Sequence, residues 1–164
     1  MKKIKIYLDT SVINFLFADD SPEKKEITEQ FFDLFIKTGI YETYISIFVL
    51  EELNNTGDSM KRDLLISSIK KFQVQVIDTL KNETDIDSLS AEYLKHQVVP
   101  ESKIFDALHV AACTVLEIDF LVSWNYKHLA NVNRERRFIA VNQLFNYNYP
   151  LRIVTPENLF NDEY

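Results

Sequence analysis

Cysteine, glycine and proline are scarce in this chain: its 164 residues include one cysteine, two glycines and four prolines. The single cysteine, Cys113, leaves no partner for an intrachain disulfide, and its place in an apolar stretch is typical of a packed thiol. The shortage of glycine and proline argues against long flexible linkers and low-complexity segments. We therefore expect one domain, residues 1–164, in a reducing compartment such as the cytoplasm.

Long hydrophobic runs are also missing. The first apolar stretch is interrupted by Lys5 and ended by Asp9, too short for a signal peptide, and no later run could cross a bilayer. We therefore expect no membrane partner. Lys and Arg total 18 against 25 Asp and Glu, a net charge of -7, which argues against a general nucleic-acid coat. An acidic pocket beside a local basic patch is still compatible with this charge.

Two kinds of site are excluded by what the chain lacks. The glycines, Gly39 and Gly57, stand alone, whereas the phosphate-binding loops of nucleotide enzymes need clustered glycines. Zinc sites need closely spaced histidines and cysteines. The one cysteine has no second cysteine beside it, and the three histidines are widely separated in the chain (His96, His109 and His128).

Short β-prone runs alternate with segments of helical periodicity along the whole chain. The expected strands are residues 4–8, 44–46, 74–77, 120–122 and 152–154. Helices are expected directly after Asp9, from residue 48, and over residues 21–39, 58–70, 83–95, 104–116 and 131–145. This alternation implies parallel pairing through right-handed crossovers. The expected fold class is α/β, a three-layer α/β/α sandwich with a mainly parallel central sheet.

Polar residues follow three of the expected strands. Asp9 comes after the first strand, Ser46 after the second, and the segment from Ser123 to Asn125 after the fourth. Ligands collect at the carboxyl ends of parallel strands, so these residues are candidates for a binding site. Asp9 has a second interpretation as the N-cap of the following helix, and the residue alone does not separate the two.

Three further acids are candidates for the same site. Glu51 and Glu52 are adjacent in an expected helix, so one can face the sheet end while the other faces solvent. Asp106 interrupts a dense apolar run, where a lone buried carboxylate would be costly. The positive end of a helix starting near Ser102 offers a structural explanation for the carboxylate of Asp106. His109, one turn further along, is placed either to hydrogen-bond to Asp106 or to pack in the core.

Four motifs follow one another along the chain: residues 7–12 with Asp9, Ser46 followed by Glu52, residues 105–111 with Asp106, and residues 121–125. Their order and spacing resemble those of PIN-domain ribonucleases, a family that includes the VapC-type toxins. The resemblance covers nearly the whole chain. It implies a PIN-like fold and a Mg²⁺-dependent endoribonuclease, with Mn²⁺ as an alternative ion.

The resemblance also implies roles for particular residues. Asp9, Glu52 and Asp106 become the metal-binding carboxylates, which selects Glu52 over Glu51, and Ser123 and Asn125 close the site. Clustered carboxylates repel one another unless a cation lies among them, and Mg²⁺ suits oxygen ligands. The family usually has a fourth acid in the place of Asn125 or a few residues on, where this chain has His128. A second metal site is therefore expected to be weak or to form only with substrate.

The implied reaction is hydrolysis of an RNA phosphodiester by a water that Mg²⁺ activates. Asp9 and Asp106 would anchor the ion, Glu52 would position or deprotonate the water, and Asn125 would complete the pocket. Substrate contacts are expected from four residues (Thr10, Ser123, Lys127 and His128). Thr10 is equally well explained as a helix-capping residue. The basic residues after Asn125 are equally well explained as the solvent-exposed face of a helix.

Several alternatives stay open at this point. A catalytically weakened PIN-like module that binds RNA or a protein is the main one, because the fourth acid is missing. DNA is an alternative substrate. A phosphatase of the haloacid-dehalogenase type is excluded, since Ser11 stands where a second acid is needed. By analogy with the toxins, we expect an antitoxin protein as partner and a homodimer.

Overall fold

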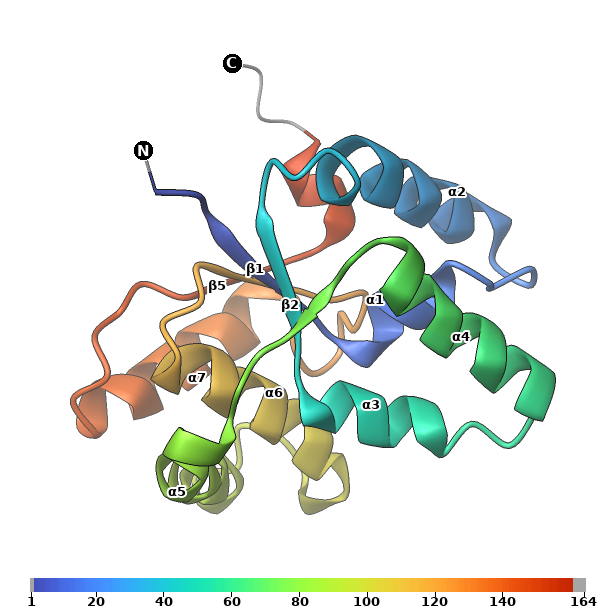
Figure 1. Ribbon diagram of the computed structural model, residues 1–164. Coiled ribbons are helices and arrows are strands. Elements are labelled where there is room, and N and C mark those ends of the chain that lie inside the picture. The colour runs from blue at the N-terminus through green and yellow to red at the C-terminus, as the bar shows by residue number, and fades with distance from the viewer. Residues whose placement is uncertain (1, 161–164) are drawn as a thin grey trace.

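Five parallel strands form the central sheet of the protein, whose computed structural model describes residues 2–160 (Figure 1). The sheet order is β3-β2-β1-β4-β5. The strands are β1 (Lys5–Leu8), β2 (Glu42–Ile45), β3 (Gln75–Val76), β4 (Phe120–Val122) and β5 (Arg152–Val154). In the register of the sheet, Tyr7 of β1 lies between Tyr44 of β2 and Leu121 of β4. The expected parallel α/β architecture is confirmed.

Helices cover both faces of this sheet and make the three expected layers. Helices α5, α6 and α7 pack together in one layer, whereas α1 packs against α2 and α4 in the other (Figure 1). The α-helices of the described part are α1 (Thr10–Phe15), α2 (Pro22–Phe31), α3 (Ile47–Asn54), α4 (Ser59–Lys71), α5 (Glu83–Lys95), α6 (Ile104–Val115) and α7 (Val132–Leu144). Short 3₁₀ turns lie at Leu80–Asn82, Glu101–Lys103 and Pro156–Leu159. Within residues 2–160, no helix combines the length and apolarity needed to cross a membrane.

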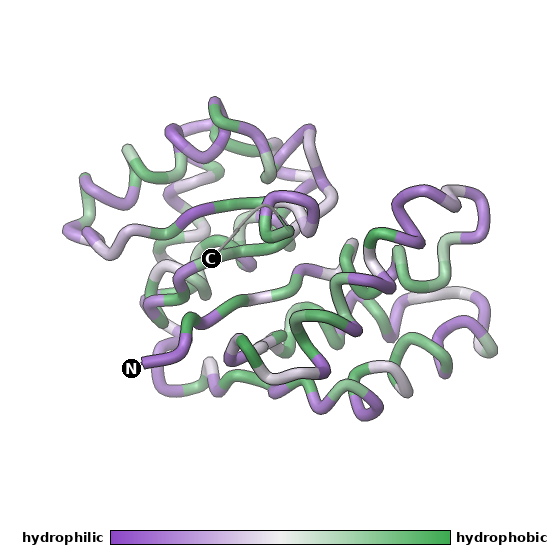
Figure 2. The backbone as a smooth tube through the Cα atoms, turned by 90° about the horizontal axis from the view of Figure 1, so that it is seen from above, coloured by the Kyte–Doolittle hydropathy of each residue, from purple (hydrophilic) through white to green (hydrophobic). Residues whose placement is uncertain are grey.

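The core is built around β1. Ile6, Tyr7 and Leu8 are fully buried, because a central strand is covered by helices on both faces. Along the helices, hydrophilic and hydrophobic stretches alternate, as expected where only one helix face is buried (Figure 2). Cys113 is buried among these apolar residues, in agreement with the expected packed thiol.

Two elements differ from the expectation. The helix expected over residues 21–39 ends as an α-helix at Phe31 and continues as a π-helical turn, Phe32–Ile36. Phe31 and Phe32 are both fully buried, and the wider turn accompanies the burial of two successive aromatic rings. Strand β3 is only two residues long, because it lies at the sheet edge with an exposed side-chain pattern.

The chain order places a switch point beside β1. From β1 the chain runs to β2 and β3 on one side of the sheet, and β4 and β5 lie on the other side. Open parallel sheets bind ligands at such a point, outside the carboxyl ends of the strands. Asp9 follows β1 there, and Ser123 follows β4.

Candidate functional site

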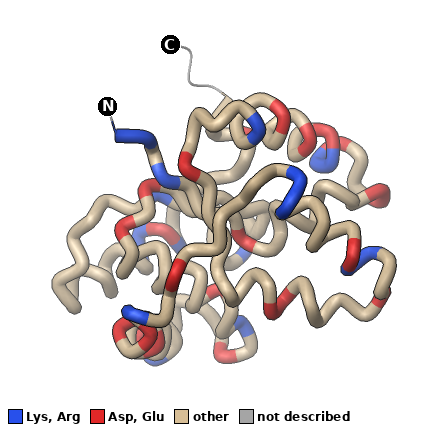
Figure 3. The backbone as a smooth tube through the Cα atoms, in the orientation of Figure 1, with Lys and Arg blue, Asp and Glu red and all other residues tan. Residues whose placement is uncertain are grey.

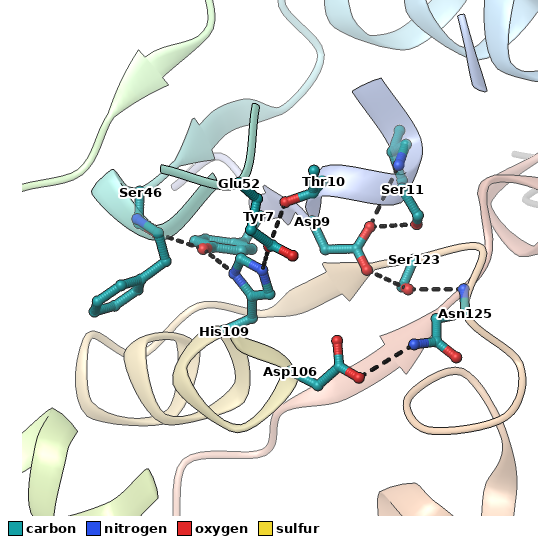
Figure 4. Close-up of polar contacts among 12 residues, drawn as sticks. Tyr7, Asp9, Thr10, Ser11, Ser46, Glu52, Asp106, His109, Ser123 and Asn125 are labelled. Carbon is teal, nitrogen blue, oxygen red and sulfur yellow. Dashed lines mark hydrogen bonds and ion pairs between the residues drawn. The ribbon is translucent and has the colours of Figure 1, made fainter. Parts of the chain in front are cut away.

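A polar pocket of about 310 Å³ lies at this switch point. Its lining comes from the start of α1, from α3, from the start of α6 and from the loop after β4. Five of the residues predicted from the sequence line it: Asp9, Thr10, Glu52, Asp106 and Asn125. Figure 4 shows the carboxylates of Asp9, Glu52 and Asp106 directed toward one shared space from three elements.

Asp9 combines the two roles that its sequence position suggested. It is the N-cap of α1 and accepts a hydrogen bond from the Val12 backbone N–H, and it is only 3% exposed at the base of the pocket. The hydroxyls of Ser11 and Ser123 donate to its two oxygens over 2.5 Å each. Burial raises the pKa of Asp9, against the opposing effect of these hydrogen bonds.

Glu52 is the acid of its pair that faces the pocket. Glu51 is exposed and borders a different surface hollow, so the choice of Glu52 agrees with the geometry. Oε1 of Glu52 accepts hydrogen bonds from Thr10 Oγ1 at 2.5 Å and from His109 Nε2 at 2.6 Å. Burial acts to raise the pKa of Glu52, but the hydrogen bonds that Glu52 accepts from His109 and Thr10 act in the opposite direction, and the pKa of Glu52 is lowered.

Asp106 lies in the first turn of α6, as expected, and is half-buried. Burial raises the pKa of Asp106 to about 6. The nearby charges of Asp9 and Glu52 add to the rise, whereas the charge of Lys103 opposes it. Asp9 and Glu52 therefore disfavour the ionisation of Asp106.

Asn125 presents a donor to the pocket. Its Nδ2 donates to Asp106 Oδ2 at 3.3 Å, while its Oδ1 accepts the backbone N–H of His128 at 3.0 Å. The amide oxygen is thus engaged by the backbone, and the amide nitrogen holds Asp106. The position at the pocket edge agrees with the expectation, but the group facing Asp106 is a hydrogen-bond donor.

The remaining predicted residues lie around the pocket. Ser123 is fully buried behind Asp9, so its hydroxyl supports Asp9 and cannot reach a substrate. Lys127 is exposed outside the pocket lining. His128 is 7% exposed, does not line the pocket, and its Nδ1 has no hydrogen-bond partner among the described residues. Substrate contacts by Lys127 and His128 stay predictions.

Two pocket residues carry roles that the sequence did not suggest. Lys103, in the turn before α6, lines the pocket and places a positive charge near the carboxylates. His109 contacts Glu52 and Tyr7 rather than Asp106, and its burial agrees with the second interpretation of this residue, packing in the core. The ring sits one turn along α6 from Asp106, on the side that meets α3. In the sequence, Lys103 is indicated only by its position three residues before Asp106.

Other hollows are present on the described part of the surface. A larger cavity of about 410 Å³ near α2 and α4 is lined by four apolar residues, two serines and three charged residues, and the charged ones (Glu29, Asp33 and Lys71) are exposed. Lys and Arg are scattered among Asp and Glu over the molecule (Figure 3). Among the basic residues after Asn125, Arg134 and Arg137 donate hydrogen bonds to backbone carbonyls of the α5–α6 loop.

The donor set is suited to a hard divalent cation. Within residues 2–160, no group of three or more His, Cys, Asp or Glu side chains is arranged to hold a metal ion. Mg²⁺ does not require three, because it commonly binds one or two protein carboxylates and keeps several waters. Asp9 and Asp106 line one pocket, and the charge of Asp9 adds to the raised pKa of Asp106, an electrostatic cost that a bound cation relieves.

Comparison with known proteins gives no family assignment. No protein-family model matches the chain, and no curated protein matches it. The function is therefore inferred from the pocket itself.

Proposed function

We propose that the protein is a Mg²⁺-dependent ribonuclease of the PIN type that hydrolyses RNA phosphodiester bonds. One observation carries the proposal: Asp9, Glu52 and Asp106, far apart in sequence, line one pocket at the switch point of a parallel sheet. The raised pKa of Asp106 supports it, because a carboxylate that is costly to ionise in the free protein gains from a cation.

The chain's own groups have separable roles in this proposal. Asp9 and Asp106 would hold the ion, which when bound supplies stabilisation of charge on phosphate oxygens and makes water acidic. Glu52, kept ionised by hydrogen bonds from Thr10 and His109, accepts a proton from the attacking water. Lys103 attracts the phosphodiester to the acidic pocket.

Cleavage of single-stranded RNA tests the proposal directly. The purified chain is incubated with RNA and DNA of one sequence, with Mg²⁺, with Mn²⁺ or with EDTA. We expect RNA to be cut with either ion and to stay intact with EDTA. If every RNA remains whole with both ions, the ribonuclease proposal is rejected, and cutting of the DNA alone would change the substrate.

The adjacent acids of α3 provide a matched pair of variants. Glu52→Gln removes the proton acceptor, so we expect kcat for RNA to fall by about 100-fold or more, the usual contribution of general acid–base catalysis. Glu51→Gln removes the same charge from the exposed side of the helix and should leave kcat within about twofold. Equal losses in both variants would contradict the role of Glu52.

A second candidate function is an RNA- or protein-binding module with weakened catalysis. The observation that favours it is Asn125, an amide donor where the resemblance leads one to expect an acid. Such a module binds RNA in a fluorescence anisotropy titration but leaves it intact in the cleavage assay.

The proposal extends to a cellular role only through the PIN-family resemblance. On that basis the protein is the cytoplasmic toxin of a toxin–antitoxin pair, acts as a homodimer and is inhibited by a small antitoxin. Growth arrest on expression, relieved by Asp9→Asn, is the expected outcome.

A further inference from the structure

A chain of buried hydrogen bonds reaches Glu52 from the far side of the pocket. Ser46 Oγ lies 2.5 Å from Tyr7 Oη, Tyr7 Oη lies 2.7 Å from His109 Nδ1, and His109 Nε2 lies 2.6 Å from Glu52 Oε1 (Figure 4). Ser46 and Tyr7 are fully buried and His109 is 1% exposed. The chain leaves α3 at its N-cap, passes through β1 and α6, and returns to α3 at Glu52.

The direction of the proton donors follows from the first member. Ser46 Oγ caps α3 by accepting the Phe48 backbone N–H at 3.1 Å. Its own proton then needs an acceptor, because a buried hydroxyl without one is unfavourable. The acceptor that the described residues offer is Tyr7 Oη, so Ser46 donates to Tyr7.

The rest of the chain is then determined. Tyr7 Oη accepts the hydrogen bond from Ser46 and donates its own O–H to His109 Nδ1, which must therefore be the unprotonated nitrogen. The proton of the neutral imidazole lies on Nε2 and is donated to Glu52 Oε1. If His109 Nδ1 instead donated to Tyr7 and Tyr7 donated to Ser46, the hydroxyl proton of Ser46 would have no acceptor. His109 Nε2 would then either carry no proton and face the Glu52 carboxylate with its lone pair, or carry a second ring proton.

We infer that Ser46, Tyr7 and His109 form a positioning relay that holds His109 in the Nε2–H tautomer and thereby orients the Glu52 carboxylate toward the pocket. Thr10 Oγ1 donates to the same oxygen, Oε1. Both bonds therefore hold one oxygen of Glu52, and Oε2 is the oxygen left for the pocket. The catalytic consequence rests on the proposed function, whereas the tautomer does not.

The tautomer is measured without RNA or metal. Long-range ¹H–¹⁵N correlation spectra of protein labelled with ¹⁵N-histidine separate protonated from unprotonated ring nitrogens, and a His109 variant assigns the signals. We expect an unprotonated Nδ1 and a protonated Nε2 for His109 at neutral pH. A proton on Nδ1, in either tautomeric or doubly protonated form, overturns the inference whatever the outcome of the cleavage assay.

Two buried tyrosines give a matched pair for the functional consequence. Tyr7→Phe removes the donor to Nδ1, and Tyr93→Phe removes a buried hydroxyl that contacts Asn142 and Thr114, outside the site. We expect Tyr7→Phe to mix the His109 tautomers and to lower kcat about 10- to 100-fold with little change in KM, as for groups that orient a catalytic ligand. Tyr93→Phe should change neither, and an unchanged tautomer and kcat in Tyr7→Phe overturn the relay.

Substitution at His109 provides the second comparison, should Tyr7→Phe fail to fold. Glutamine can still donate an N–H to Glu52, whereas leucine cannot. We expect His109→Gln to retain about tenfold more kcat than His109→Leu, and equal activities in the two folded variants overturn the inference. If wild-type protein cleaves no RNA, the proposed function fails while the tautomer measurement still decides the relay.

Discussion

We expect Asp9→Asn to abolish Mg²⁺-dependent RNA cleavage, lowering kcat/KM by about 1,000-fold or more. The metal contribution to such reactions is worth several kcal/mol, and about 1.4 kcal/mol corresponds to a factor of ten. Asparagine is as good an N-cap as aspartate, so α1 keeps the hydrogen bond from Val12 N–H. The variant therefore removes the charge and leaves the helix start in place.

The matched control is Asp58→Asn. Asp58 is the N-cap of α4 and accepts from the backbone N–H groups of Met60 and Lys61, but it is exposed and outside the pocket. We expect its cleavage rate to equal that of the wild type. Rates are measured on one labelled RNA, and circular dichroism checks that both variants fold. Wild-type rates in Asp9→Asn would contradict the proposed metal site.

Asp106→Asn is expected to stabilise the free protein while removing its response to Mg²⁺. The pKa of Asp106 is raised from 3.8 to about 6, so the folded state binds the proton more tightly than the unfolded chain does. The stability that this group contributes is present below pH 4 and is lost as the pH rises through about 6. Asparagine carries no charge and can still accept the hydrogen bond from Asn125.

The expected change in the free energy of unfolding follows from the raised pKa of Asp106. A pKa unit corresponds to about 1.4 kcal/mol, and partial exposure reduces the gain, so we expect Asp106→Asn to be more stable by on the order of 2 kcal/mol above pH 6. Below pH 4 the two proteins should be equally stable. Urea unfolding between pH 3.5 and 8 gives both values. Mg²⁺ should raise the melting temperature of the wild type alone, because a ligand stabilises only the state that binds it.

Asp85→Asn is the control for this prediction. Asp85 is the third residue of α5, as Asp106 is of α6, but it is exposed. An exposed acid near a helix N-terminus is mildly stabilising, so its loss should cost about 0.3–1 kcal/mol at neutral pH. The two substitutions therefore have opposite signs. If Asp106→Asn is less stable than the wild type at pH 7.5, the Asp106 carboxylate stabilises the fold and is not a cation ligand.

Local patterns accounted for most of the fold and for part of the site. Every expected strand is present, and the helix expected over residues 83–95 has the bounds of α5. Short-range hydrogen bonding and side-chain periodicity set these elements, and both can be followed along a sequence. The same holds for Asp9, which the sequence places between a strand and a helix and which is the N-cap of α1 at the carboxyl end of β1.

The sequence alone therefore determined the parallel α/β architecture, and its resemblance to the PIN-domain family selected the three acids that line the pocket. Tertiary structure alone decided which groups hold those acids. His109 binds Glu52, which is 57 residues away, and Ser123 binds Asp9, which is 114 residues away. The direction of a buried side chain depends on how neighbouring elements pack and on which protons lack an acceptor. Neither condition leaves a periodic pattern in the chain, so the relay behind Glu52 and the donor role of Asn125 emerged only from the folded protein.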